Sequence, residues 1–396
     1  MTALTPTIVR PVVLVSVDHY LPGYKAGGPI RSIANMVAQL GDTFHFHIVA
    51  VDRDLGDDHG YPGVVPNTWT DCGKARVFYR TPGRAGWRAL LDSLADIDFD
   101  LLYLNSFFST DATLRFLAYH RLGRIARRPV LLATRGELSR GALALKAPKK
   151  RAFIAIAKVL GLYRGVTFHA SSDYEAEDIK NIFGPSICIS VASNLSTNEK
   201  LAELKHNSDN YRRIRGVFLS RISQKKNLLG AIDILDDPGV PDMDLDIYGT
   251  LENKAYWEAC QENIAKLHGN VRVKYCGALH HDAVLDTLSG YDFFFFPTLG
   301  ENFGHVIAEA LAVGLPVLIS DQTPWRDLQA KGVGADLPLD QPEAFRAWIR
   351  QFSAYTPVER QAIRLAAQAF GRSRQLADED RQANCAMLRA AMAQNP

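Results

Sequence analysis

Residues 291–321 read YDFFFFPTLGENFGHVIAEALAVGLPVLISD, and this stretch decides the fold. It opens with the apolar run Phe293–Phe296, which is typical of a strand buried on both faces of a parallel sheet. A polar loop follows, and then apolar residues recur at helical spacing up to Gly314, whose position suits a helix C-cap. Pro316 starts a second apolar strand, Val317–Ser320. This order of strand, loop, helix and strand predicts a parallel α/β sheet, which places its ligands at the carboxyl ends of the strands.

The turn before the predicted helix is suited to binding a phosphate and a sugar. Gly304 has no side chain, so an anion can approach the first free amides of the helix, where the helix dipole favours negative charge. We therefore expect ligand contacts from the turn residues Asn302, Phe303, Gly304 and His305. Glu301 and Glu309 are badly placed to hold phosphate, but their carboxylates can accept hydrogen bonds from sugar and ribose hydroxyls.

A pair of cations follows the first strand of the second half of the chain. The strand is predicted at Val217–Arg221, and a helical pattern starts after Lys226. Arg221, with its forked guanidinium, and Lys226, as a point charge, can together clamp a diphosphate. The next strand, Leu245–Tyr248, ends at Gly249, which leaves room for a base or a sugar at the sheet edge. These residues predict a nucleotide-diphosphate site.

The same segments carry a resemblance to a known family. PTLGENFGHVIAEALAVGLPV, together with R-x4-K-N at Arg221–Asn227 and SSDYEAEDI at residues 171–179, resembles the retaining glycosyltransferases of family 4 and their Glu-x7-Glu motif. The resemblance implies the α/β fold called GT-B, two Rossmann-like doubly wound domains that face each other across a cleft. It also implies that Glu309 holds the nucleotide ribose and that Glu301 faces the donor sugar.

The domain boundaries are expected around a polar stretch, Asn194–Arg213. We place a Rossmann-like acceptor domain at residues 1–195 and a nucleotide-sugar donor domain at residues 213–375. The resemblance implies that the last helix, at about residues 376–396, packs back on the first domain. Within the donor domain, a further helix is predicted to begin at Pro324–Arg326.

Apolar strand runs and helical patterns also alternate in the first half, which predicts a doubly wound parallel sheet. Gly27 and Gly28 lie at its first strand-to-helix turn, outside any GxGxxG motif. Such a pair is explained either by turn geometry or by a ligand that approaches the backbone. The resemblance implies that it faces the donor phosphates. Arg135 and Glu137 stand where many family members carry a histidine, so the role of that histidine stays open, and Arg135 can contact a phosphate or a sugar hydroxyl.

Composition and charge exclude several other classes of protein. The net charge is only +2, from 45 basic and 43 acidic residues, so no global field favours nucleic acid. The five cysteines form no CxxC pair, and the histidines show no ligand spacing, so we expect neither a metal nor a cofactor. No apolar run approaches the ~18 residues of a membrane span, and the start lacks a signal-peptide pattern. We expect a cytoplasmic protein.

One segment, residues 146–165, combines a basic start with apolar residues at helical spacing: Phe153, Ile156, Ala157 and Leu160. Two interpretations stay open. The helix is either packed on the core with a solvated basic face, or it docks on the anionic inner face of the cytoplasmic membrane as a peripheral contact.

We predict a retaining hexosyltransferase that moves a hexose-type sugar from a UDP- or GDP-sugar to a glycan or lipid-linked acceptor, in cell-envelope or exopolysaccharide synthesis. Its predicted catalytic residues are Arg221, Lys226 and Glu301. Two alternatives remain: a nucleotide-sugar epimerase of the same fold, which would need no acceptor, and a non-catalytic nucleotide-sugar-binding protein.

Overall fold

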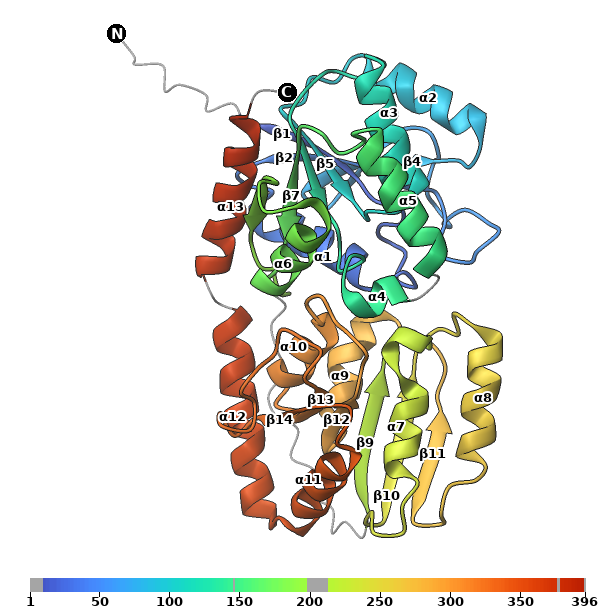
Figure 1. Ribbon diagram of the computed structural model, residues 1–396, viewed down its shortest axis with the longest axis vertical. Helices are drawn as coiled ribbons and strands as arrows, with labels where there is room; N and C mark the ends of the chain where they lie inside the picture. Colours follow the sequence, from blue (N-terminus) through green and yellow to red (C-terminus); the bar gives the residue numbers. More distant parts are fainter. Residues whose placement is uncertain (1–9, 145–146, 198–212, 376–377, 395–396) are drawn as a thin grey trace. The chain divides into compact units, whose positions relative to one another are not determined.

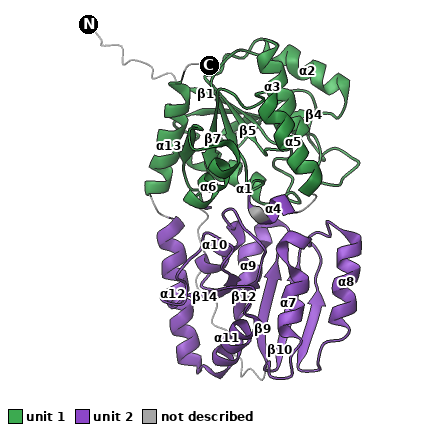
Figure 2. Cartoon of the chain, viewed as in Figure 1, with its two compact units in different colours: residues 1–138, 146–195, 378–396 green, residues 139–145, 196–377 purple. Residues whose placement is uncertain are grey.

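The computed structural model describes residues 10–144, 147–197, 213–375 and 378–394. The chain divides into two compact units (Figure 2). The first unit comprises residues 1–138, 146–195 and 378–396, and the second comprises residues 139–145 and 196–377. Each unit is an α/β layer structure around its own parallel sheet (Figure 1).

The first unit is built on an eight-stranded sheet with the order β3-β4-β2-β1-β5-β6-β7-β8. Among the described strands of this sheet, only β3 runs antiparallel to its neighbour. The strands are β1 (Val12–Ser16), β2 (His45–Val51), β3 (Trp69–Cys72), β4 (Ala75–Arg80), β5 (Leu101–Asn105), β6 (Val130–Ala133), β7 (Val166–Ala170) and β8 (Ile189–Val191). The helices are α1 (Gly28–Leu40), α2 (Arg84–Leu94), α3 (Arg115–Arg121), α5 (Ala147–Val159), α6 (Asp173–Phe183) and α13 (Asp378–Met392), with the short π-helix η1 (Thr110–Leu114) before α3.

The second unit has a six-stranded parallel sheet with the order β11-β10-β9-β12-β13-β14. The strands are β9 (Ile214–Leu219), β10 (Met243–Tyr248), β11 (Val271–Tyr275), β12 (Phe293–Phe296), β13 (Val317–Ser320) and β14 (Gly334–Leu337). The helices are α4 (Arg140–Ala144), α7 (Leu228–Leu235), α8 (Lys254–Ile264), α9 (Val284–Ser289), α10 (His305–Ala312), α11 (Pro342–Ala354) and α12 (Pro357–Gln375), with the 3-10 turns η2 (Gln224–Lys226) and η3 (His281–Ala283).

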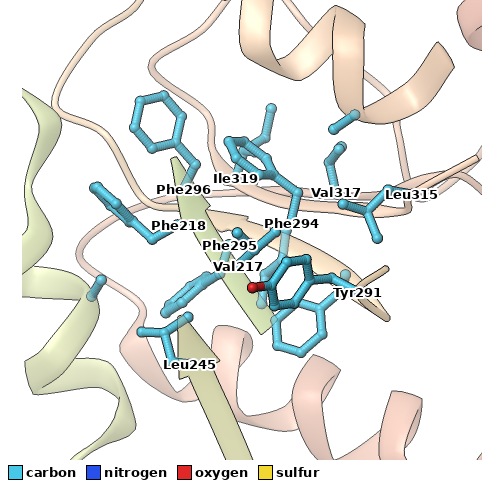
Figure 3. Packing of buried hydrophobic residues seen from close by; sticks show 14 of the residues in the cluster. Val217, Phe218, Leu245, Tyr291, Phe294, Phe295, Phe296, Leu315, Val317 and Ile319 are labelled. Atoms are coloured by element: carbon cyan, nitrogen blue, oxygen red, sulfur yellow. The ribbon is translucent and has the colours of Figure 1, made fainter. Parts of the chain in front are cut away.

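The predicted order of strand, loop, helix and strand is confirmed as β12, α10 and β13. All four phenylalanines of β12 are fully buried and belong to the unit's core. Figure 3 shows Phe294, Phe295 and Phe296 among their apolar neighbours. Phe293 packs on Trp348 and Phe352 of α11, with ring centroids 5.6 and 5.7 Å apart. Phe296, which points to the other face, packs on Phe218 of β9 at 5.4 Å. Burial on both faces explains why this strand is uniformly apolar rather than alternating.

Three details of the prediction differ from the structure. The helix expected from Pro324 does not form, and the described residues 321–333 contain no helix. The Thr323 hydroxyl bonds the backbone N–H of Trp325 instead, at 3.2 Å, and such local bonds compete with helix formation. The strands β3 and β14 were not predicted, since four residues that include aspartate or glycine carry little strand signal.

Gly249, directly after β10, shows how tightly the carboxyl edge of this sheet is packed. Its φ is 147°, and a Cβ atom there would lie 1.7 Å from the carbonyl oxygen of Ser220. Its N–H donates to the Gly277 carbonyl at 2.9 Å, and its own carbonyl accepts from Tyr275 at 2.8 Å. Three strand ends therefore meet at one residue that must be glycine.

We expect Gly249→Ala to destabilise the second unit by about 1–3 kcal/mol through backbone strain alone, with a further loss from the overlap with Ser220. Urea unfolding measures the change. Gly269→Ala is the matched control, because no atom lies within 4 Å of a Cβ built there and its φ is not positive. Equal stability of the two variants would show that the edge is not packed in this way.

Candidate functional site

The second sheet changes direction at its centre. From β9 the chain goes outward through β10 and β11, and then returns to place β12 on the other side of β9. Ligands of doubly wound sheets bind where the strand order reverses, at the carboxyl ends of the strands. The two loops at this point are the loop after β9, with Arg221 and Lys226, and the loop after β12, with Glu301 and Gly304. The structure thus brings the main predicted site residues of the second half to one edge.

Hydrogen bonds join these two loops directly. Asn227 donates from its side chain to the carbonyl of Pro297 at 2.7 Å. The carbonyl of Lys225 accepts from both the hydroxyl and the following amide of the other loop, Thr298 Oγ1 and Leu299 N, each at 3.0 Å. The two loops are therefore held as one surface in the absence of a ligand.

The start of α10 has the geometry expected of an anion site. Gly304 is the N-cap, in the left-handed region with φ 78°, so it turns the chain from the loop into the helix without strain. The helix N-terminus offers backbone N–H groups that have no partner within the helix itself. Phe303, which we expected to contact the ligand, has a buried ring that packs on Trp325, and its carbonyl accepts from Trp325 Nε1 at 2.6 Å. Phe303 therefore supports the turn, and any ligand contact comes from its backbone.

The remaining predicted residues of this turn lie around it. His305 is the first residue of α10, with its ring 4.7 Å from that of Phe303, and Asn302 is half-buried in the loop. Glu309, one turn further along α10, is 8% exposed. A carboxylate so well buried is suited to a specific hydrogen-bonding role rather than to a solvated helix face.

Lys226 and Glu301, which we predicted to bind different parts of the donor, form an ion pair with each other. Their side chains are only 14% and 12% exposed. The ammonium group of Lys226 also lies 5.6 Å above the ring of Phe296. The pair is thus well shielded, so it is stronger than an ordinary surface pair, and removing one partner leaves the other charge poorly solvated.

Arg221 forms a weaker pair with Glu252, which follows β10. The distance from Arg221 Nη1 to Glu252 Oε2 is 3.0 Å, and the two side chains are 33% and 42% exposed. Exposed pairs of this kind contribute about 0–1 kcal/mol. The guanidinium can therefore leave Glu252 for a phosphate at little cost.

The first sheet also reverses its strand order, between β1 and β5. Gly27 is the N-cap of α1 and Gly28 its first residue, in the connection that follows β1. No atom lies within 4 Å of a Cβ built on Gly28, so packing does not require a glycine there. The space around Gly28 leaves its backbone open to the approach of a ligand.

Arg135, after β6, is held inside the first unit. Its guanidinium donates to Asn105 Oδ1 at 3.0 and 2.6 Å, to Asn194 Oδ1 at 2.7 Å and to the Tyr103 hydroxyl at 3.2 Å. Of the five N–H donors of arginine, one is left. Burial and the nearby Arg135 cation lower the pKa of His169, which bonds Tyr103. Arg135 is therefore first of all a structural clamp, and its capacity for a phosphate or sugar contact is small.

Two half-buried carboxylates, Asp18 and Glu137, lie at the same edge of the first sheet. Glu137 accepts hydrogen bonds from Ser106 Oγ at 2.6 Å and Phe108 N at 2.9 Å, and Asp18 accepts from Ser109 Oγ at 2.6 Å. Burial raises the pKa of both carboxyl groups, although these hydrogen bonds oppose the rise. Through these hydrogen bonds, Asp18 and Glu137 hold the loop after β5 against the ends of β1 and β6.

Sequence reasoning missed Asp18 as a structural partner and Glu252 as the partner of Arg221. Each follows a strand by a few residues, at an edge where other site residues had already been placed. A carboxylate shortly after a strand was the available signal. Carboxylates of solvated loops also follow strands in this way, so sequence alone does not separate a paired carboxylate from a solvated one.

The second unit is similar to a known family of protein domains. Residues 200–368 match the family model described as "Glycosyl transferases group 1". The second unit is therefore similar to group 1 glycosyltransferase domains. The search of curated protein sequences gives no match.

Solved structures of other proteins are similar to nearly the whole chain, the first unit included. Sucrose-phosphate synthase from Thermosynechococcus elongatus is similar with a TM-score of 0.73 at 15% identity, covering 97% of this chain and 100% of that chain. HepE from Anabaena, in complex with UDP and glucose, has a TM-score of 0.63 at 17% identity, covering 96% and 100%. WaaG, a glycosyltransferase involved in lipopolysaccharide biosynthesis, has a TM-score of 0.62 at 12% identity, covering 94% and 98%. At these identities the likeness concerns the fold, and the fold is GT-B.

No described helix is long and apolar enough to cross a membrane. Within the same residues, no group of three or more His, Cys, Asp or Glu side chains is arranged to hold a metal ion.

Proposed function

We propose that this protein is a retaining glycosyltransferase that moves a hexose-type sugar from a nucleotide-diphosphate sugar to a glycan or lipid-linked acceptor. One observation carries the proposal. The four side chains of the predicted donor site, Arg221, Lys226, Glu301 and Glu309, lie in loops and a helix around the strand reversal of a group 1 domain. The similar HepE structures contain UDP or UDP-glucose, which supports UDP as the nucleotide.

The chemical step requires stabilisation of negative charge. As the bond between sugar and phosphate breaks, charge develops on the diphosphate while the anomeric carbon becomes oxocarbenium-like. Arg221, Lys226 and the first amides of α10 stabilise that charge in this proposal, because they are fixed before the reaction begins. The departing phosphate accepts the acceptor's proton on the same face of the sugar, so no nucleophile from the protein is assigned. The cations take the role that a metal ion would otherwise have.

The two ion pairs indicate how the donor enters. A diphosphate draws Arg221 from its exposed partner Glu252, and it shares Lys226 with Glu301. Glu301 is then held beside the diphosphate by Lys226, where its second oxygen accepts a hydrogen bond from the sugar. The resemblance assigns Glu309 to the ribose, and its burial agrees with a fixed contact.

We expect Arg221→Ala and Lys226→Ala each to lower turnover about 10²–10³-fold, because one preorganised charge contact is lost. The assay follows UDP release in the presence of EDTA. Glu252→Ala is the matched control for Arg221, since it breaks the same ion pair but keeps the cation, and Lys225→Ala is the control for Lys226. Normal turnover in a test variant, or an equal loss in its control, would remove that residue from the diphosphate site.

The two glutamates are expected to separate nucleotide from sugar. Glu309→Gln should weaken binding of UDP, because a ribose contact is lost. Glu301→Gln should leave UDP affinity unchanged or raise it, because Lys226 is released, but it should lower kcat/KM for the intact donor. Titration calorimetry with UDP and GDP measures the first effect and identifies the base. An equal loss of UDP affinity in both variants contradicts this division.

We further propose that α5 docks on an anionic membrane surface. Its buried face is formed by Ile154 and Ala157, so the predicted stripe is only partly correct. Ile156, Val159 and Leu160 are 58%, 87% and 70% exposed. The exposed basic residues of the same segment are Lys149, Arg151, Lys158 and Arg164. An exposed apolar group surrounded by cations matches the chemistry of an interfacial helix.

Replacing Val159 and Leu160 with serine should reduce co-sedimentation with anionic liposomes and leave the net charge unchanged. Binding by the unaltered protein should weaken with salt, because the Debye length falls from about 10 Å at 0.1 M to about 3 Å at 1 M. The control is Val358→Ser with Leu365→Ser, two exposed apolar residues of α12. Binding that ignores lipid charge, or that both double variants lose equally, would refute the docking.

A further inference from the structure

A groove of about 660 Å³ lies in the first unit, and none of the residues that line it is assigned above to the donor. Residues of α2 and α3 and of the segments next to them line it: Gly83, Arg84, Trp87, Arg88, Leu91, Asp92, Arg115, Tyr119 and Arg124. Its volume falls within the range of about 300–1,000 Å³ that is usual for small-molecule sites. The two helices are in direct contact, because the ring of Trp87 lies 5.6 Å from those of both Phe116 and Tyr119 (Figure 1).

The wall of the groove is a fixed assembly rather than a set of mobile side chains. Arg80 and Arg115 both lie over the ring of Trp87, at 4.2 and 4.7 Å from its centre. Asp111 binds both cations, Arg80 at 2.6 Å and Arg115 at 3.3 Å. Arg80 and Trp87 are each only 4% exposed. These stacked and paired guanidinium groups hold Trp87 and the start of α3 together and so give the groove a defined wall.

Charge in the groove is strongly unbalanced. Arg84, Arg88 and Arg124 make no ion pair with any residue that the structure describes. Arg84 and Arg88 lie one turn apart on α2, so their guanidinium groups can meet successive charges of one ligand. The indole N–H of Trp87 also has no hydrogen-bond partner among the described residues, but it is buried and does not open to the groove. The groove therefore presents several unused donors and a surplus of positive charge.

The remaining groups indicate what the anion is attached to. Asp92 lies one turn beyond Arg88 on α2 and also lines the groove. A carboxylate repels phosphate but accepts hydrogen bonds from neutral hydroxyls. Tyr119 offers a ring and a hydroxyl, and Leu91 an apolar patch. Cations, a hydroxyl acceptor and a ring side by side are suited to a ligand with both acidic groups and free hydroxyls.

We propose that the groove between α2 and α3 binds an acidic saccharide, a chain of sugars that carries carboxylate groups. Arg84, Arg88 and Arg124 bind the carboxylates, and Asp92 accepts hydrogen bonds from the ring hydroxyls. The groove begins at Gly83, three residues after the carboxyl end of β4, the same sheet edge at which Gly27 and Asp18 lie. A saccharide bound there is the acceptor or its anionic extension, and this role rests on the function proposed above.

The test is titration calorimetry of the full chain with tetragalacturonate. We expect saturable binding that weakens as salt rises, and no binding of the neutral maltotetraose. Arg84→Gln with Arg88→Gln should weaken tetragalacturonate binding at least about tenfold, because two charge-assisted contacts are lost. Both residues are exposed, so the fold should tolerate the change. Arg272→Gln with Lys274→Gln, two exposed cations of β11, removes the same charge elsewhere and should leave binding unchanged.

Each contrary result identifies a different error. Equal binding by the two double variants, or no tetragalacturonate binding by the unaltered protein, overturns the site. Tighter binding of tripolyphosphate through the same arginines would show that the ligand is a phosphate compound, and tighter binding of a short single-stranded oligonucleotide would show a nucleic acid. UDP affinity measured in the same samples separates this proposal from the donor site. For Arg84→Gln with Arg88→Gln we expect loss of tetragalacturonate binding and normal nucleotide binding. An unaltered protein that binds tetragalacturonate but neither UDP nor GDP would refute the glycosyltransferase and leave the groove.

Discussion

The second unit depends on the burial of β12 between two layers of side chains. Phe293 packs on α11 and Phe296 on β9, so the strand cannot shift without opening the core on both faces. Because β12 is fixed beside β9, the loops that follow these two strands lie next to each other. The bonds of Asn227 and Lys225 to the loop after β12 then join those loops at the strand reversal. The site exists because this one strand is held in place.

Helix α10 is fixed by a second constraint. A Cβ atom on Gly371 of α12 would lie 2.5 Å from the backbone nitrogen of Ala312, so the two helices meet through bare backbone. Arg364 of α12 donates to the carbonyls of Tyr291 and Ser289, before β12. The helix that carries Glu309 and the strand before the site therefore share one support. Such support outside the site is what keeps charged groups in position for charge stabilisation.

Opposed charges lie next to each other in the proposed donor site. Lys226 is paired with Glu301 in a shielded place, and Arg221 with Glu252 in an exposed one. An unpaired charge in such a shielded place would be costly. In this arrangement both Lys226 and Glu301 have a partner. The groove of the first unit differs, since Arg84, Arg88 and Arg124 have no such partners among the described residues. The paired cations of the first site must give up or share a carboxylate partner when an anion binds, whereas the unpaired arginines of the groove meet an acidic ligand without that exchange.

The sequence by itself determined the architecture and which residues lie at the carboxyl edge of the second sheet. Uniformly apolar strands, helical periodicity and Gly304 at a strand-to-helix turn are local signals, so β12, α10 and β13 could be predicted. The tertiary structure decided what depends on residues far apart in the chain: the Lys226–Glu301 pair spans 75 positions, and Arg135 is clamped by Asn194 across 59. It also decided that residues from Pro324 form no helix and that Trp325 supports Phe303. Local patterns record which residues are buried, but pairing between distant side chains follows from packing, and packing exists only in the folded chain.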